Sequence, residues 1–270
     1  MDDCFDVGVI GLGEAGTAVA RRLAEKGVKV IGSKRHAVEI EGIATTTVNT
    51  AVVDKSDVLI IAVRQTDLAG VCSELGEHVK GKIVISLVAG VETATLERLL
   101  EGAYIFRIMT SLGFEYGEAN SSFCCSSNCR LGERWLVRHL LSAGGMVTEL
   151  EENKMNAHTA AAGCGIGMLA DITSSFVEAY KGIGFDDSAA LEIAVSNLKS
   201  AARLIEKQGD AKSAADKVTS KGGATRRGRD VMESNGVKTG IINGVAAAEA
   251  RCAELSTLVN GKPGVSIRKA

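Results

Sequence analysis

Proline is almost missing from this 270-residue sequence, which contains one proline, and aromatic residues make up only 4% of it. An excess of basic residues is also missing, because the formal net charge is -2. Nucleic acid is therefore not a favoured partner. The hydrophobic fraction of 46% is ample for a sizeable core, so we expect an ordinary globular chain of one large or two smaller domains.

Targeting and membrane signals are missing as well. The N-terminus reads Met1-Asp2-Asp3-Cys4, which is acidic and lacks the basic and apolar regions of a signal peptide. No apolar run approaches the length that a membrane-spanning helix needs. We therefore expect a cytoplasmic protein without a membrane partner.

A metal-binding motif is not evident among the seven cysteines. Their odd number and the missing export signal indicate reduced thiols. Cys124, Cys125 and Cys129 form the only cluster, but it lacks the usual C-x-x-C spacing and a fourth ligand. We expect no metal there, and we interpret these residues as small buried side chains.

The most informative segment is a glycine-rich turn near the N-terminus. Residues 7–16 read VGVIGLGEAG, an apolar run that ends in G-x-G-x-x-G and precedes a helix-like segment. In a nucleotide-binding turn Gly11 permits the tight bend, Gly13 lets phosphate approach the backbone, and Gly16 lets the helix pack on the strand. Glycine turns also join strands to helices without a ligand, so the context has to support the cofactor site.

Residues after the second predicted strand, 28–32, bear on the choice of cofactor. Ser33, Lys34 and Arg35 stand where an acidic residue would bind the adenosine ribose hydroxyls. A hydroxyl and two cations suit a 2′-phosphate instead. The sequence therefore favours NADPH over NADH, and the alternative is a solvated basic turn.

Continuous apolar runs at residues 57–63, 82–88 and 104–109 predict further strands, of which the first two resemble parallel strands covered on both faces. Helical patterns at 65–75 and 93–100 lie between them. This alternation predicts a doubly wound α/β sheet, with ligands at the carboxyl ends of the strands. Those ends include residues 63–65, 89–91 and the segment after Met109.

From about residue 153 the sequence becomes alanine-rich and helical in pattern. We expect a Rossmann-type domain over residues 1–152 and an all-α domain over residues 153–270. Asp186 and Asp187 can cap a helix, and small residues at 160–167 would allow another helix to approach closely. The narrow apolar faces of these helices, including 241–255, predict a homodimer; a self-contained bundle is the alternative.

A second glycine-rich turn lies at residues 218–225, VTSKGGAT, before another predicted helix, 226–234. Free N–H groups and the positive end of that helix would receive a carboxylate, helped by the hydroxyls of Ser220 and Thr225. Nearby cations add positive potential, although such residues often form only a solvated face. These cations are Lys217, Lys221, Arg226, Arg227 and Arg229.

With both turns present, the chain resembles the pyrroline-5-carboxylate reductase family from about residue 7 to residue 255. The most specific match is DKVTSKGGAT at 216–225, which is similar to the family signature K-V-T-S-P-G-G-T-T. Residues 60–68, IIAVRQTDL, are similar to L-A-V-K-P-Q-D-L, and residues 85–91, ISLVAGV, to S-I-A-A-G-V. Asn49 stands where the family has an asparagine that contacts the cofactor.

The resemblance implies NADPH-dependent reduction of a cyclic imine carboxylate, most simply 1-pyrroline-5-carboxylate to L-proline, in a dimer that can assemble further. Thr225 would hydrogen-bond the imine nitrogen as the catalytic group, and the carboxylate would lie on Ser220, Gly223, Ala224 and Thr225. The predicted cofactor residues are Gly11, Leu12, Gly13, Glu14, Ala15, Gly16, Ser33, Lys34, Arg35, Asn49, Ala62, Val63, Arg64, Ala89 and Gly90.

Three departures from the family pattern fall on the substrate side. R-x-M-P-N-T-P is replaced by RIMTSLG at 107–113, which predicts a looser loop, S-G-S-G-P by AGCGI at 162–166, and the signature proline by Lys221. Two alternatives therefore stay open. One is a cofactor-binding regulatory or interaction protein without the reaction, and the other is a different imine or β-hydroxyacid oxidoreductase using Lys154.

Overall fold

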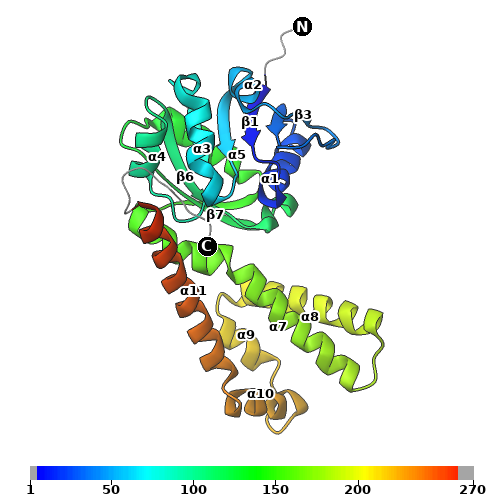
Figure 1. Cartoon of the computed structure of the whole chain (residues 1–270). Helices are drawn as coiled ribbons and strands as arrows, with labels where there is room; N and C mark the ends of the chain where they lie inside the picture. Colours follow the sequence, from blue (N-terminus) through cyan, green and yellow to red (C-terminus); the bar gives the residue numbers. More distant parts are fainter. Residues whose placement is uncertain (1–4, 261–270) are drawn as a thin grey trace. The chain divides into compact units, whose positions relative to one another are not determined.

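The computed structural model describes residues 5–260 (Figure 1). The acidic N-terminal residues 1–4 and the single proline of the sequence, Pro263, lie outside the described residues. Within 5–260 the chain forms an α/β part followed by a run of helices. The fold class expected from the sequence is confirmed.

A single sheet of eight strands organises the α/β part, in the order β3-β2-β1-β4-β5-β6-β7-β8. Neighbouring strands are parallel except for β7, which is antiparallel to β6. The order reverses direction from β1, so the chain builds the sheet outward on both sides, as in a doubly wound fold. The strands are β1 (Phe5–Ile10), β2 (Val30–Ser33), β3 (Ala44–Thr46), β4 (Ser56–Ile61), β5 (Ile83–Ser86), β6 (Tyr104–Met109), β7 (Ala119–Cys125) and β8 (Gly145–Glu149).

Helices cover both faces of this sheet and create two separate hydrophobic clusters (Figure 1). On one face α1 (Glu14–Glu25) and α5 (Leu131–Ser142) pack through residues such as Leu23 and Val137. On the other, α2 (Asn49–Asp54), α3 (Gln65–Leu75) and α4 (Thr93–Leu99) pack through residues such as Val52, Leu68 and Leu96. Burial on both faces explains the continuous apolar runs of the central strands.

Short helical turns complete the α/β part. They are the 3₁₀ helices η1 (Gly76–Val79), η2 (Leu112–Tyr116) and η3 (Glu152–Lys154), the helix α6 (Met155–His158) and the π-helical segment η4 (Thr159–Gly163). Among the cluster of three cysteines, which the sequence led us to expect buried, Cys124 and Cys129 are buried and Cys125 is half-buried.

The remaining helices are α7 (Gly165–Gly182), α8 (Asp187–Gln208), α9 (Ala211–Lys217), α10 (Ala224–Ser234) and α11 (Val237–Asn260). By its internal contacts the chain divides into a sheet unit, residues 1–164 and 248–270, and a helical unit, residues 165–247. The start and end of the helical region thus belong to the sheet unit. The domain boundary expected at residue 152 stays a prediction.

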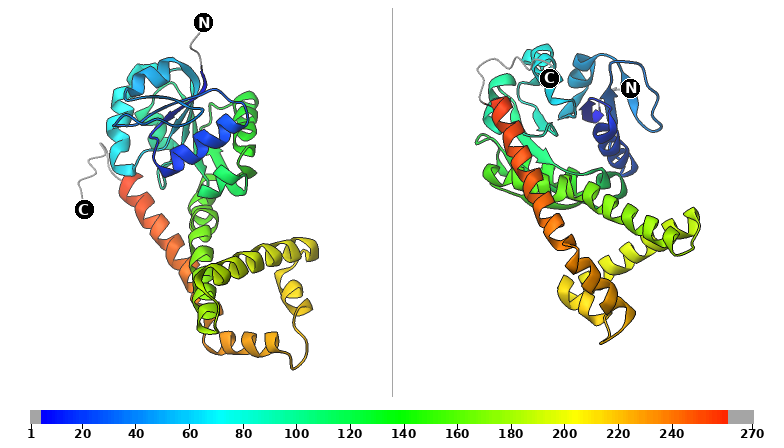
Figure 2. Two further views of the ribbon diagram at one scale, coloured as in Figure 1. Left: turned by 90° about the vertical axis from the view of Figure 1, so that its right-hand side faces the viewer. Right: turned by 60° about the horizontal axis from the view of Figure 1, so that its bottom comes forward.

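The helical unit has almost no core of its own. Over residues 165–247, all of which the structure describes, the only buried residues are Ala190, Ala194 and Ala214. Large apolar side chains on α7, α8 and α10 are exposed instead, among them Leu169, Phe176, Leu198 and Val231. Figure 2 shows that α7, α8, α9 and α10 do not pack into a compact bundle. The predicted cap of α8 is confirmed, since the Asp186 carboxylate accepts from the Ala189 N–H.

The expectation that no apolar run approaches the length of a membrane-spanning helix was wrong. Within the described residues, the helical stretch Glu152–Gly182 has 31 residues, and an 18-residue part of it reaches a mean hydropathy of 1.4, so by length and composition it could cross a membrane. The apolar character of this stretch is not obvious in the sequence, because small residues and scattered hydroxyls interrupt the apolar run. A helix that is covered by protein can have the same length and composition.

The end of α11 packs on the sheet unit. Val259 belongs to the same hydrophobic cluster as α3 and α4. The next residue, Asn260, donates from its amide to the Gly90 carbonyl at 2.8 Å and accepts from the Glu92 N–H at 3.1 Å and the Thr95 hydroxyl at 2.9 Å. These bonds fix the loop between β5 and α4.

Candidate functional site

The glycine-rich turn between β1 and α1 has the backbone geometry of an anion site. Gly11 has a φ of 100°, which favours glycine, and its N–H donates to the Ser33 carbonyl. A β-carbon on Gly16 would lie 2.1 Å from the Gly11 carbonyl oxygen, so only glycine fits there. At Gly13 a β-carbon would meet nothing within 4 Å, and no side chain caps α1. The first N–H groups of α1 are therefore available for phosphate oxygens.

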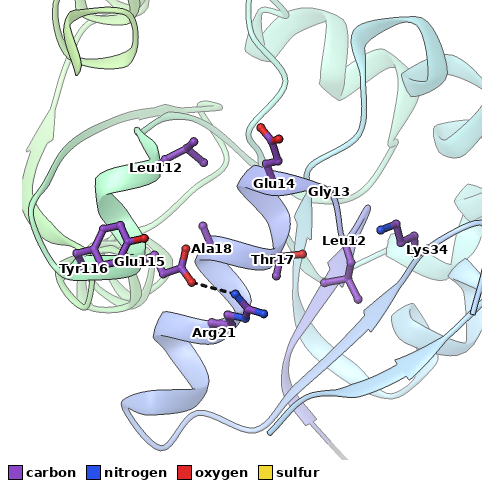
Figure 3. Close-up of a pocket in the computed structure, with 10 residues that line it drawn as sticks. All are labelled: Leu12, Gly13, Glu14, Thr17, Ala18, Arg21, Lys34, Leu112, Glu115 and Tyr116. Carbon is purple, nitrogen blue, oxygen red and sulfur yellow. Dashed lines mark hydrogen bonds and ion pairs between the residues drawn. The ribbon is translucent and has the colours of Figure 1, made fainter. Parts of the chain in front are cut away.

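A hollow of about 530 Å³ lies along this end of α1 (Figure 3). Gly13, Glu14 and Thr17 line it from the helix, and Lys34 lines it from the end of β2. The far wall comes from η2, whose Glu115 pairs with Arg21 at 3.2 Å. Thr17, Arg21 and the η2 residues Leu112 and Tyr116 are lining residues that the sequence did not reveal.

Ser33 and Asn49, predicted separately as cofactor residues, are joined by a hydrogen bond. The buried Ser33 hydroxyl donates to the Asn49 side-chain carbonyl at 2.6 Å. The Asn49 amide in turn donates to the Glu74 carboxylate at 2.7 Å. This chain of bonds orients Asn49, which is the first residue of α2. Direct contact of either side chain with a cofactor stays a prediction.

Arg35 and Arg64, from the ends of β2 and β4, converge on Asp67 in the first turn of α3. The Arg35 Nη2 atom lies 2.7 Å from Asp67 Oδ1, and the Arg64 Nε atom lies 3.0 Å from Oδ2. Partial burial works to raise the pKa of Asp67, but the hydrogen bonds and charges of Arg35 and Arg64 lower it below its ordinary value. Asp67 was not among the predicted site residues, although its i,i+3 spacing from Arg64 could have indicated it.

The two remaining segments that were predicted to bind the cofactor also lie together. Ala62 follows β4 and donates its N–H to the Ile10 carbonyl, beside the glycine turn. The Gln65 amide donates to the Ala89 carbonyl at 3.1 Å, which links the loop of Ala62, Val63 and Arg64 to the loop of Ala89 and Gly90. Both loops follow strands at the carboxyl edge of the sheet, and Ala62 lies directly against Gly11 and Gly16 of the turn.

The segment after β6, expected to be loose for lack of prolines, is held by internal contacts. Its Thr110 hydroxyl bonds to that of Ser121 at 2.7 Å, and Phe114 is buried against Gly144. A β-carbon on Gly163 of the π-helical segment would lie 3.2 Å from Met109 Sδ. The two segments that depart from the family pattern thus pack against each other, and π-helical turns often mark functional sites.

Arg107, at the start of the first altered segment, is buried with a charge partner. Its guanidinium donates to the Glu152 carboxylate at 3.1 Å and to the Asn156 side chain at 2.7 Å. The same carboxylate accepts from the backbone and hydroxyl of Thr93. This network joins β6, α4 and the start of the helical region.

The second glycine-rich turn, in the helical unit, opens onto α10 as expected. Gly222 has a φ of 71°, and Gly223 is the N-cap of α10 and lacks a side-chain cap. A β-carbon on Gly223 would lie 2.3 Å from the Ser220 hydroxyl, so that hydroxyl sits directly at the helix start. Thr225 in the first turn lines a separate hollow of about 700 Å³. Lys221 lies inside the turn.

Two of the five cations near this turn are engaged by carboxylates. Arg229 pairs with Asp216 at 2.9 Å and also binds the Thr219 hydroxyl at 2.8 Å, and Arg226 pairs with Asp230 at 2.9 Å. The bonds of Arg229 join α10 to the end of α9, whereas the Arg226–Asp230 pair lies within α10. Thr225 and the first glycine turn belong to different units, so their meeting in one site stays a prediction.

Among residues 5–260 no group of three or more histidine, cysteine, aspartate or glutamate side chains could hold a metal ion.

Comparison with known proteins assigns the two parts of the chain separately. Residues 152–255 match the family model described as pyrroline-5-carboxylate reductase dimerisation. Residues 6–90 match the model described as NADP oxidoreductase coenzyme F420-dependent. The pyrroline-5-carboxylate reductase of Aquifex aeolicus is 30% identical over 241 residues, which cover 86% of this chain and 90% of the relative. The chain belongs to the pyrroline-5-carboxylate reductase family.

The family likeness extends over nearly the whole chain in other organisms. The pyrroline-5-carboxylate reductase of Methanosarcina acetivorans is 29% identical, with 92% of this chain and 97% of the relative covered. Human pyrroline-5-carboxylate reductase 2 is 27% identical, with 95% and 85% covered.

The fold is also that of solved members of the family. The Plasmodium falciparum pyrroline carboxylate reductase, crystallised with NADP bound, has a TM-score of 0.88 at 20% identity, with 95% of this chain and 100% of that one covered. At this identity the likeness establishes the fold of this member of the oxidoreductase family.

Proposed function

We propose that this chain catalyses NADPH-dependent reduction of 1-pyrroline-5-carboxylate to L-proline. The observation that carries the proposal is the presence of two uncapped, glycine-opened helix starts, one at Gly13 and one at Gly223. A dinucleotide carries a pyrophosphate and the substrate a carboxylate, so the reaction needs two anion sites of this kind. Membership of the family supports this assignment of the two sites.

NADP suits the first site by its geometry. Gly13 leaves space where a β-carbon would stand, and the N–H groups of Glu14, Ala15 and Gly16 would receive the pyrophosphate. Lys34, Arg35 and the Ser33–Asn49 pair would hold the adenosine end and favour NADPH over NADH. When bound, the cofactor supplies the hydride.

The substrate would lie on the second turn. Ser220 and the N–H groups of Gly223, Ala224 and Thr225 would hold its carboxylate, and the Thr225 hydroxyl would hydrogen-bond the imine nitrogen. A protonated imine is already electrophilic, so positioning supplies most of the rate and no strong acid is required. The Thr225 hydroxyl would lie next to the path by which a proton reaches the imine nitrogen.

The helical unit would be completed by a second copy of the chain. Its three buried alanines cannot form a core, and its exposed apolar side chains are typical of an obligate interface. A partner subunit rather than lipid would then cover the apolar stretch Glu152–Gly182. We propose a cytoplasmic homodimer that can assemble further, without a membrane or nucleic-acid partner.

Turnover measurements on Thr225 variants test the reaction. The wild type should oxidise NADPH in the presence of pyrroline-5-carboxylate, and Thr225→Ala should lower kcat by about 10²–10⁴-fold while NADPH affinity stays the same. Thr225→Ser keeps the hydroxyl and is the matched control that should retain most activity. Equal loss of NADPH binding and turnover would contradict the role given to Thr225.

The six-membered homologue of the imine addresses the altered segments 107–113 and 162–166. Preference for that homologue would show that these segments change the substrate. Failure to turn over either imine, with NADPH binding intact, would instead indicate a cofactor-binding protein that has lost the reaction.

A further inference from the structure

Asp67 lies between two cations that come from different parts of the sheet. Arg35 follows β2 and Arg64 follows β4, and these strands flank β1 in the sheet order. Each guanidinium contacts a different oxygen of the Asp67 carboxylate, at 2.7 Å and 3.0 Å. One carboxylate therefore holds two arginines side by side at the carboxyl edge of the sheet.

The exposure of the three side chains shows which of them faces outward. The Asp67 side chain is 22% exposed, whereas those of Arg35 and Arg64 are 68% and 74% exposed. A guanidinium has five N–H donors, and each ion pair engages one nitrogen of its arginine. Most of the donor surface of both arginines thus faces solvent above a sheltered carboxylate.

The charge of this cluster matches one particular ligand group. Lys34, Arg35 and Arg64 carry three positive charges and Asp67 one negative charge, which leaves a net charge of +2. A phosphate monoester carries roughly -1.5 to -2 at neutral pH. Lys34 lines the hollow beside the glycine turn, so the cluster stands where the adenosine end of a dinucleotide would lie.

We propose that Asp67 is a positioning residue that holds Arg35 and Arg64 together as a clamp for the adenosine 2′-phosphate of NADP. The inference rests on the proposed NADP-dependent function and names a further residue in it. Without the carboxylate the two guanidiniums repel each other and lose their common orientation. Arginine recognises phosphate through the geometry of its donors, so loss of orientation weakens binding although the net positive charge rises.

Simple charge screening makes the opposite prediction for the same residue. If Asp67 only offsets positive charge, its removal strengthens the attraction for the phosphate and tightens NADP binding. The sign of the change in affinity therefore separates a positioning role from a screening role.

The test measures the Kd of NADP⁺ and of NAD⁺ by calorimetry for the wild type, Asp67→Asn and Asp67→Glu. Asp67→Asn should raise the Kd of NADP⁺ by roughly tenfold, equivalent to one charge-assisted contact, and leave that of NAD⁺ within about twofold. Asp67→Glu keeps the charge and should restore part of the loss. Asp57→Asn removes the same charge from an exposed position at the other end of β4 and should change neither Kd.

The outcomes distinguish the two proposals. Unchanged or tighter NADP⁺ binding by Asp67→Asn, in a protein whose wild type prefers NADP⁺, would overturn the role of Asp67 alone. A wild type that binds NADP⁺ and NAD⁺ equally would overturn the proposed cofactor preference and the clamp together. An equal rise in both Kd values would show that Asp67 supports the fold and does not position the arginines.

Discussion

The side-chain amide of Asn260 donates a hydrogen bond to the backbone carbonyl of Gly90 at 2.8 Å. Gly90 has a φ of 77°, and a β-carbon there would lie 3.2 Å from the backbone nitrogen of Ser256 in α11. The last turns of α11 and the loop after β5 thus fit closely together. Because Ala89 and Gly90 are predicted cofactor residues, α11 braces a wall of the proposed NADP site from behind.

Replacing Asn260 should weaken the contact between α11 and the loop after β5. Asn260→Ala leaves the Gly90 carbonyl and the Glu92 N–H without their partner, which should lower the free energy of unfolding by about 1–3 kcal/mol. Chemical denaturation at one fixed protein concentration measures this. Thr257→Ala, which removes an exposed hydroxyl from the same turn, should change stability by no more than about 0.5 kcal/mol. Equal losses of stability in both variants would contradict the stabilising role given to the Asn260 hydrogen bonds.

Replacement of Gly16 should mainly lower stability, whereas replacement of Gly13 should mainly weaken NADPH binding. Gly16→Ala places a β-carbon against the Gly11 carbonyl oxygen and should lower the free energy of unfolding by about 1–3 kcal/mol. Gly13→Ala meets no protein atom, so stability should fall by less than about 1 kcal/mol while the Kd of NADPH rises at least roughly tenfold. Denaturation and NADPH titration of both variants check this contrast. Normal NADPH binding by Gly13→Ala would count against the pyrophosphate site.

Exposed apolar residues should matter for assembly only in the helical unit. Leu169 on α7 is 53% exposed and Trp135 on α5 is 65% exposed. Leu169→Glu should halve the mass measured by light scattering at micromolar protein, because it places a charge in the proposed dimer interface. Trp135→Glu is the matched control and should keep the dimer mass. A monomeric wild type would refute the dimer itself.

The buried thiol of Cys72 should make stability depend on alkaline pH. Burial raises the pKa of Cys72 to about 12, whereas an unfolded thiol titrates near about 8.5. The folded state favours the neutral thiol, so its contribution is complete below about pH 8.5 and is lost as pH rises toward 12. Between pH 8 and pH 10 this thiol should account for a fall of about 2 kcal/mol in the free energy of unfolding.

Denaturation of the wild type and of Cys72→Ala at both pH values measures the contribution of the thiol. The variant will be less stable at pH 8 because of the lost packing, but its fall in stability from pH 8 to pH 10 should be smaller by about 2 kcal/mol. Identical pH dependence in the two proteins would show that Cys72 does not titrate as its burial implies.

Much of the α/β part could be predicted from the sequence because burial on both faces leaves a clear pattern. The segments 65–75 and 104–109 coincide with α3 and β6. The strand expected at 28–32 begins only at Val30, because the Val28 N–H instead bonds to the Leu23 carbonyl at the end of α1. Strand boundaries of this kind depend on how the preceding helix ends, which periodicity does not show.

β7 escaped prediction for a different reason. Its sequence, ANSSFCC, has two serines that look exposed, yet Ser121 and Ser122 are buried. Their hydroxyls find partners in Thr110 and Met155, which come from other segments. A buried hydroxyl satisfied by a distant residue has no local signature.

The same distinction between local and distant contacts applies to the site. Arg64 and Asp67 are three residues apart in one helical turn, so their pairing could be inferred from spacing alone. The approach of Arg35 to Asp67 needs the order of β2, β1 and β4 in the sheet, which the sequence does not specify. The contact between the end of α11 and Gly90 likewise has no signature in the local sequence.

The contact between α11 and Gly90 has a consequence for folding during synthesis. Gly90 and Asn260 are 170 residues apart, so a ribosome working at about 5–20 residues per second needs roughly 10–30 s to synthesise Asn260 after Gly90. Once β8 has been synthesised, the nascent sheet unit can pair all its strands, but the loop after β5 still lacks its contact with α11. A nascent chain stalled before α11 should therefore contain a folded sheet whose cofactor wall is still open to proteolysis.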